Sequence, residues 1–283
     1  MSTERVDVRV GDLCFECDVA GERSASLVLL LHGFPQTSHT YRHDLPALAR
    51  AGFHAVAPNQ RGYSTGARPN SVESYRVELL IADALAIADH FGAARFHLVG
   101  HDWGGQLAWL IAARHPERLR SLTVLSRPHP GAFRGALRND PAQSQRSRHH
   151  SLFQDPESAR RLLADDAARL RKLLARQGVG PEDIAAYLER LNDEPALDAA
   201  INWYRPESNR ASAKDVPNVS VPTLYIWGDQ DATVGRAAAE ATAAYVDGPY
   251  HFEVIAGAGH FITDQAGPRV SELLVAHVQQ HDH

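Results

Sequence analysis

The sequence predicts an α/β protein with a mostly parallel β-sheet, helices on both of its faces and an inserted helical segment. Short β-type runs alternate with longer helical patterns, which is the order expected when helices connect parallel strands. Leu27–Leu31 is apolar at every position, which suits a strand buried on both faces. The alternation stops over residues 128–216, where we find no convincing strand, and resumes after Pro217.

Eight strands are expected, each a short β-type run that ends near a Gly, a Pro or a polar turn. They are Val6–Val10, Leu13–Val19, Leu27–Leu31, Phe53–Ala57, Arg95–Val99, Leu119–Leu125, Val221–Trp227 and Tyr250–Ile255. The first two form a hairpin around Gly11-Asp12. Helices are expected at Tyr41–Ala51, Val72–Phe91, Trp103–His115, Pro156–Gln177, Pro181–Leu191, Arg236–Tyr245 and Pro268–Gln280.

The predicted division of the chain is a core of residues 1–127 and 217–283 and a helical cap of residues 128–216. Both ends of the insertion connect to strands of the sheet, which favours a cap over a separate domain. Open α/β sheets bind their ligands at the carboxyl edge of the strands, so we expect the cap to cover that edge.

Composition excludes several classes of function. The chain has 283 residues, 44% of them hydrophobic and 22% charged, as in ordinary globular proteins. A net charge of −5 argues against nucleic acid or an anionic membrane as the main partner. We see no signal peptide and no apolar run long enough to span a bilayer, and there are only 2 Cys. We therefore expect a cytoplasmic protein that acts on a small molecule.

The strongest chemical signal is the segment Gly100–Gly105, which reads G-H-D-W-G-G. It lies between a predicted strand and a predicted helix, as the G-x-nucleophile-x-G turn requires. Asp102 occupies the position where esterases carry serine. The start of the following helix favours an ionised carboxylate there.

Three further segments follow predicted strands. His32–Gln36 reads H-G-F-P-Q, and the backbone N–H groups of Phe34 and Trp103 could together stabilise an oxyanion. Trp227–Asp231 contains two acids, and Gly257–Phe261 contains His260. The chain order of nucleophile, acid and histidine is that of this class of turn, and position singles out His260 among 16 histidines.

These motifs together resemble the α/β-hydrolase fold, in its epoxide hydrolase and dehalogenase branch, and most of all bacterial epoxide hydrolases. The resemblance covers nearly the whole chain and implies a triad of Asp102, His260 and Asp231, with Asp231 chosen over Asp229 as the last residue of G-x-x-D. It also implies a cis peptide before Pro35. Asn59 replaces the family's usual Asp, a change that we interpret as structural.

An aspartate nucleophile changes the expected reaction. A carboxylate that attacks a saturated carbon yields an ordinary alkyl ester, whereas attack on an ester carbonyl would yield a high-energy anhydride. We therefore expect Asp102 to open an epoxide and become alkylated. His260, held by Asp231, then activates the water that cleaves the ester and releases a vicinal diol.

The cap supplies the remaining expected groups. Asn202–Arg205 resembles the N-W-Y-R stretch of epoxide hydrolases, which implies that Tyr204 polarises the epoxide oxygen. His149 stands where a second cap donor is usual, with His150 as the alternative register. We expect substrate contacts from the following residues: Phe34, Pro35, Trp103, His150, Trp203 and Phe261. No cofactor and no metal site is expected.

Alternatives remain open. Trp103 could bind a halide through its indole, as in haloalkane dehalogenases, although those usually carry Asn where this chain has Phe34. Fluoroacetate dehalogenases share H-G-F-P-Q but usually place Arg after the nucleophile. A non-catalytic ligand receptor on the same fold is the third reading. The chain is expected to be a monomer or a homodimer.

Overall fold

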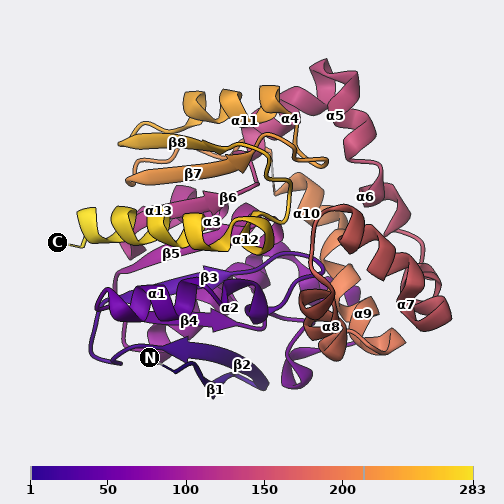
Figure 1. The fold of residues 1–283 in the computed structure, drawn as a ribbon, viewed down its shortest axis with the longest axis horizontal. Helices are drawn as coiled ribbons and strands as arrows, with labels where there is room; N and C mark the ends of the chain where they lie inside the picture. Colours follow the sequence, from indigo (N-terminus) through magenta and orange to yellow (C-terminus); the bar gives the residue numbers. More distant parts are fainter. Residues whose placement is uncertain (1, 213, 283) are drawn as a thin grey trace.

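A single sheet of eight strands lies at the centre of the protein (Figure 1). The computed structural model describes residues 2–212 and 214–282, apart from the side chains at 149, 210 and 211. The strand order is β1-β2-β4-β3-β5-β6-β7-β8. The strands are β1 (Glu4–Val10), β2 (Leu13–Ala20), β3 (Leu27–Leu31), β4 (His54–Pro58), β5 (Phe96–His101), β6 (Leu119–Leu125), β7 (Thr223–Gly228) and β8 (Tyr250–Ile255).

Strand directions confirm the predicted fold class. The β1–β2 and β2–β4 pairs are antiparallel, and every other neighbouring pair is parallel. Three of the predicted strands, β3, β6 and β8, have the predicted bounds. Gly11 turns the chain between β1 and β2 with φ 57, as the predicted hairpin requires.

Helices cover both faces of the sheet. On one face α1 (Asp44–Arg50) packs beside α13 (Gly267–Gln280), and on the other lie α2 (Val77–His90) and α3 (Trp103–Arg114). Successive side chains of β3 alternate between the two faces, with Val28 and Leu30 in one core and Leu29 and Leu31 in the other. This double burial explains why the strand is apolar throughout.

The predicted helix Val72–Phe91 is wrong in one respect, because it is broken. A 3-10 turn, η3 (Val72–Tyr75), precedes α2, and Arg76 between them has an extended backbone at φ −61 and ψ 141. The side chain of Asn209 bridges the break, accepting from the Val77 N–H at 2.8 Å and donating to the Tyr75 carbonyl at 3.0 Å. A distant side chain therefore caps the helix where local sequence predicted continuity.

Between β6 and β7 the described residues form helices, gathered largely beyond one end of the strands (Figure 1), and a single isolated β-bridge between Val219 and Val246. They are α4 (Pro130–Asn139), α5 (Pro141–Arg146), α6 (His149–Leu152), α7 (Ser158–Arg176), α8 (Pro181–Arg190), α9 (Glu194–Ile201), η5 (Asn202–Tyr204) and α10 (Glu207–Ala211). The long helices α7 and α8 match predicted ones. However, α7 is interrupted at Ala164–Ala167, where Asp165, Asp166 and Ala167 take positive φ.

The remaining elements are short. They are η1 (Ser38–Tyr41), η2 (Thr65–Ala67), η4 (Pro116–Arg118), α11 (Arg236–Ala241), η6 (Thr242–Tyr245) and α12 (Ile262–Gln265). The Asn59 Oδ1 accepts the N–H of Ser38 at 3.0 Å, and the hydroxyl of Ser38 donates to the Asp18 Oδ2 at 2.5 Å. Within the described residues, no helix combines the length and apolar character needed to cross a membrane.

Candidate active site

Asp102 lies on a strained turn between β5 and α3. Its backbone angles are φ 50 and ψ −113, in a region that side-chain-bearing residues rarely adopt. The turn is possible because Gly104 packs directly on the backbone of Leu31, where an added Cβ would overlap the Leu31 carbonyl. The strained backbone thus presents the carboxylate at the carboxyl end of the sheet, as expected of a nucleophile on this kind of turn.

The loop after β3 contacts the same carboxylate. The Phe34 N–H donates to the Asp102 Oδ1 at 3.1 Å, and the Phe34–Pro35 peptide is cis, in agreement with the resemblance. Gly33 lies so close that an added Cβ would overlap the Asp102 side chain. Trp103 is the first residue of α3, so its backbone N–H has no acceptor within the helix. Of the two expected oxyanion donors, the Phe34 N–H therefore contacts the Asp102 carboxylate, and the Trp103 N–H follows Asp102 directly in the chain.

His260 stands between two carboxylates. Its Nε2 lies 3.5 Å from the Asp102 Oδ2, and its Nδ1 lies 2.9 Å from the Asp231 Oδ2. The second oxygen of Asp231 accepts the N–H groups of Thr233 and Val234 at 2.6 and 2.8 Å, which orients this fully buried carboxylate. The geometry is that of a nucleophile, a base and an orienting acid.

The other acid of the W-G-D-Q-D segment has a different place. The Asp229 Oδ1 accepts the Gly257 N–H at 2.8 Å and so closes the loop after β8. The same oxygen accepts from the side-chain amide of Gln230, next to it in the chain, at 3.2 Å. Asp231, and not Asp229, is therefore the acid that contacts His260.

The charges of the three groups depend on one another. Burial alone would raise the pKa of Asp102, but the hydrogen bond and positive charge of His260 outweigh burial, and the pKa lies well below its ordinary value. Burial alone would lower the pKa of His260, but the charges of Asp231 and Asp102 raise it from 6.5 to about 10. The resting site therefore holds an ionised Asp102 beside an imidazolium.

Asp102 and His260 open onto a cavity of about 520 Å³ between the sheet's edge and the inserted helices. Four more of the predicted site residues line it: Phe34, Pro35, Tyr204 and Phe261. The opposite wall comes mainly from α6 and α7 and includes Phe153, Leu162 and Leu170. The cavity is large enough for a small organic molecule and is apolar next to the reactive groups.

Tyr204 reaches this cavity from η5, through a cluster of aromatic rings. Its ring centroid lies 5.1 Å from Trp103, 5.6 Å from Phe34 and 4.8 Å from Phe153. Burial raises the pKa of Tyr204 well above its ordinary value, the negative charge of Asp102 adds to the rise, and a side-chain hydrogen bond with Trp103 opposes it. Tyr204 is therefore a neutral phenol that can donate a hydrogen bond.

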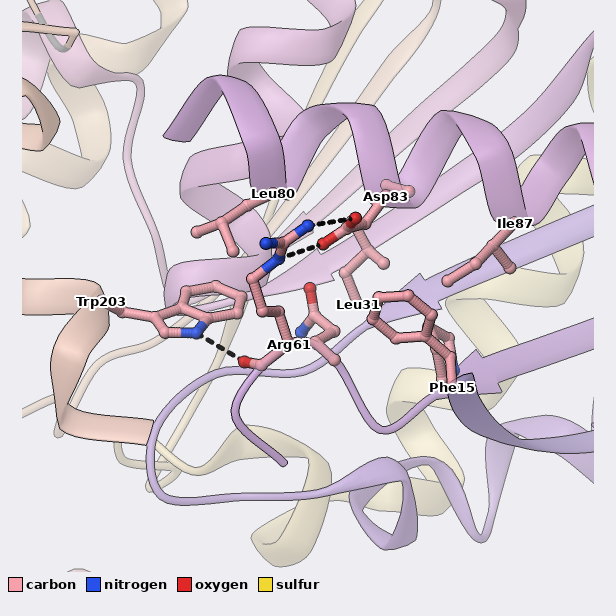
Figure 2. Close-up of a pocket in the computed structure, with 10 residues that line it drawn as sticks. Phe15, Leu31, Arg61, Leu80, Asp83, Ile87 and Trp203 are labelled. Atoms are coloured by element: carbon pink, nitrogen blue, oxygen red, sulfur yellow. Dashed lines mark hydrogen bonds and ion pairs between the residues drawn. The ribbon is translucent and has the colours of Figure 1, made fainter. Parts of the chain in front are cut away.

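Three residues predicted to contact substrate, Trp203, Trp103 and His150, do not line the cavity. The indole N–H of Trp203 donates to the Arg61 carbonyl at 2.8 Å, and the side chain is almost fully buried. Figure 2 shows it against the paired Arg61 and Asp83, beside a void of only about 10 Å³. Such a void holds at most about one water molecule. Trp103 contacts Tyr204 from outside the lining.

The two candidate second donors are placed differently. The side chain of His149 lies outside the described residues. The ring of His150 lies 5.4 Å from that of Tyr204, and His150 is not among the residues that line the cavity.

Sequence reasoning missed three residues that hold the triad in place. The His101 Nε2 lies 2.9 Å from the His260 carbonyl, and Arg146 donates to the Asp231 carbonyl at 2.9 Å. Gln265 accepts the Gly259 N–H at 2.5 Å and donates to the carbonyl of Gln177, at the end of α7. His101 stood within a recognised motif, whereas the other two contacts join segments too far apart for a sequence signal.

No cofactor site was expected, and the described residues contain no group of three His, Cys, Asp or Glu arranged to hold a metal ion. The triad itself is held by hydrogen bonds within the chain.

Comparisons with known proteins find the same kind of relative, the epoxide hydrolases, among sequences and among solved structures. A family model described as the alpha/beta hydrolase fold matches residues 26–266. Epoxide hydrolase 4 of Mus musculus is 34% identical over 96% of this chain and 79% of its own length. Epoxide hydrolase A of Mycobacterium tuberculosis is 32% identical over 90% of this chain and 91% of its own. A solved epoxide hydrolase from Bacillus megaterium, in complex with an inhibitor, has a TM-score of 0.87 and 26% identity, covering 97% of this chain and 100% of that one.

Proposed function

This chain belongs to the α/β-hydrolase fold family and to the epoxide hydrolase branch within it, and we propose that it adds water to an epoxide to give a vicinal diol. The observation that carries the proposal is a carboxylate at the nucleophile position. Asp102 lies 3.5 Å from His260 and shares a cavity with the phenol of Tyr204. We further propose that residues 128–216 act as the cap that closes this cavity.

The first step is displacement at a ring carbon. An Asp102 oxygen forms a bond to the carbon, the carbon–oxygen bond of the ring breaks, and its electron pair moves to the epoxide oxygen. The low pKa of Asp102 keeps the nucleophile ionised, and the neutral Tyr204 donates its proton or a hydrogen bond to the leaving oxygen. His149 or His150 is the second donor in this proposal. The product is an alkyl ester of Asp102.

The second step cleaves that ester. Alkylation removes the negative charge of Asp102, so His260 loses one of the two carboxylates that raise its pKa. It then gives up its proton, which replaces through solvent the one that Tyr204 gave to the epoxide oxygen, and becomes available as a base. A water that gives its proton to His260 attacks the Asp102 carbonyl carbon, and the N–H groups of Phe34 and Trp103 stabilise the oxyanion. As the oxyanion collapses, the ester C–O bond breaks, His260 returns the proton to the leaving oxygen, and the diol is released.

The test is to block the second step and weigh the protein. A His260→Gln variant exposed to a panel of epoxides, starting with styrene oxide, should gain the mass of one epoxide, because deacylation lacks its base. His251→Gln is the matched control, since His251 is exposed and contacts only Glu253 among described residues. It should turn over styrene oxide without accumulating an adduct.

Two outcomes would contradict the proposal. An adduct that persists after Asp102→Asn is added to His260→Gln would assign the nucleophile elsewhere. An adduct formed from haloalkanes with loss of halide, and from no epoxide, would make the protein a dehalogenase. The place of Trp103 supports the epoxide, because its ring packs edge-on against Tyr204 at 5.1 Å and does not line the cavity in which a halide would have to be bound.

A further inference from the structure

The exposed end of the cavity carries an excess of positive charge. Three arginines line it: Arg146 from α5, and Arg161 and Arg169 from either side of the interruption in α7. The carboxylates in the lining are Asp102, at the buried end, and Asp155. The chain as a whole has a net charge of −5, so this local excess opposes the overall balance.

The three guanidinium groups are not equally engaged. Arg161 pairs with Asp155 at 2.6 Å, and Arg146 donates to the Asp231 carbonyl at 2.9 Å. Arg169 is exposed and forms no hydrogen bond or ion pair with any residue that the structure describes. Its five N–H donors therefore face the cavity and solvent, free for an oxyanion to bind in a forked geometry.

Between the arginines and the triad the cavity wall is apolar. Leu162, Leu170 and Leu173 of α7 lie on one side, together with Leu152 of α6. Leu152 and Leu173 are 68% and 40% exposed, and they are the large hydrophobic side chains that stand exposed among the described residues. Uncovered apolar side chains that line one cavity mark a binding surface for an apolar group.

We infer that the substrate is an amphipathic epoxide, with a hydrocarbon chain along the leucines and a carboxylate bound by Arg169. The inference rests on the proposed function and names the substrate class for that same site. A soluble carboxylate fits better than an anionic lipid surface, because the guanidinium group lines the same cavity as the nucleophile. Arg161 adds long-range attraction although Asp155 partly neutralises it.

The experiment compares each terminal-epoxy carboxylic acid with its own methyl ester, over a series of chain lengths. The readout is the ratio of the two kcat/KM values, which cancels differences in folding and in chemistry. We expect the acid to be preferred at one best chain length. Arg169→Gln should reduce that preference about two- to fivefold, the range for a partly exposed ion pair, and added salt should do the same.

Arg171→Gln is the matched control. Arg171 is two residues away on α7, pairs with Asp166 at 3.5 Å and does not line this cavity. Its acid-to-ester ratio should equal that of the unmodified chain. Equal turnover of acids and esters by the unmodified chain, or an equal loss of preference in both variants, would overturn the inference.

Binding separates this inference from the proposed function. Calorimetry with octanoate and with methyl octanoate, which contain no epoxide, should show tighter binding of octanoate and its loss in Arg169→Gln. If no epoxide is turned over but this preference persists, the proposed function fails and the anion site stands. If octanoate binds no better than its ester while anionic phospholipid vesicles bind through Arg169, the arginines serve a membrane surface and the inference is wrong.

Discussion

Replacing Asp102 by Asn should lower the pKa of His260, by an amount that the geometry sets. The Asp102 Oδ2 and the His260 Nε2 are 3.5 Å apart, and both side chains are largely buried. Coulomb's law over this distance corresponds to roughly 5 kcal/mol at an effective dielectric constant of about 20, and to roughly 1 kcal/mol in bulk water. At about 1.4 kcal/mol per pKa unit, the loss of this charge lowers the pKa of His260 by roughly one to three and a half units.

The assay is a titration of the His260 ring by NMR, with the signal assigned from its absence in His260→Gln. The unmodified chain should show a pKa of about 10 for His260, and Asp102→Asn a value roughly one to three and a half units lower. Asp229→Asn is the control, because Asp229 contacts Gly257 and not His260. It should leave the titration unchanged.

The result bears directly on the proposed mechanism, because alkylation of Asp102 would remove the same charge as the Asn substitution does. A pKa of His260 that stays near 10 in Asp102→Asn would refute the reasoning, since His260 would then remain protonated through the second step. A fall of the same size in the pKa of His260 in Asp229→Asn would also refute the reasoning, because Asp229 does not contact His260.

Three more predictions follow from individual contacts. Tyr204→Phe should lower kcat/KM for an epoxide by roughly 10² or more in steady-state assays, because a proton donor is lost, and unchanged kcat/KM would exclude that role. Asp83→Ala should cost about 3–5 kcal/mol in urea unfolding, since it strands Arg61, which donates to Asp83 at 2.7 Å on two nitrogens. Adding Arg61→Met should recover part of that loss, and further destabilisation would contradict the argument. Stability from His260 should be complete below its unfolded pKa of 6.5 and lost as pH rises towards about 10, and this part of the pH dependence of the unfolding free energy should be absent in His260→Gln.

Local signals account for most of the core. Leu27–Leu31, Leu119–Leu125 and Tyr250–Ile255 were predictable to the residue, because each is a β-type run with a clear stop at its end. The short helices of the insertion, such as α5 and α6, were not predicted, since a helix of a few residues depends on packing more than on its own sequence. The break at Arg76 escaped prediction because Asn209, far along the chain, makes it.

For the candidate site, too, the sequence accounts for some placements and only the packed structure accounts for others. Strand-end motifs in a set order bring Asp102, Asp231 and His260 to one edge of a parallel sheet, and sequence spacing carries that order. Trp203 was expected at the substrate as part of the same N-W-Y-R segment as Tyr204. Its indole N–H instead donates to the Arg61 carbonyl. Neighbouring residues of one short helix point in different directions, and only the packed neighbours decide which of them meets the cavity.

The amino-acid sequence by itself determined the fold class, the presence of a carboxylate at the proposed nucleophile position and the chain order of the proposed triad, because these follow from local periodicity and from side-chain chemistry. Tertiary structure alone decided the pKa of His260, the exposure of Arg169 and the apolar path between them. Those properties depend on distance and on access to water, and both are set by contacts between residues that are remote in the chain.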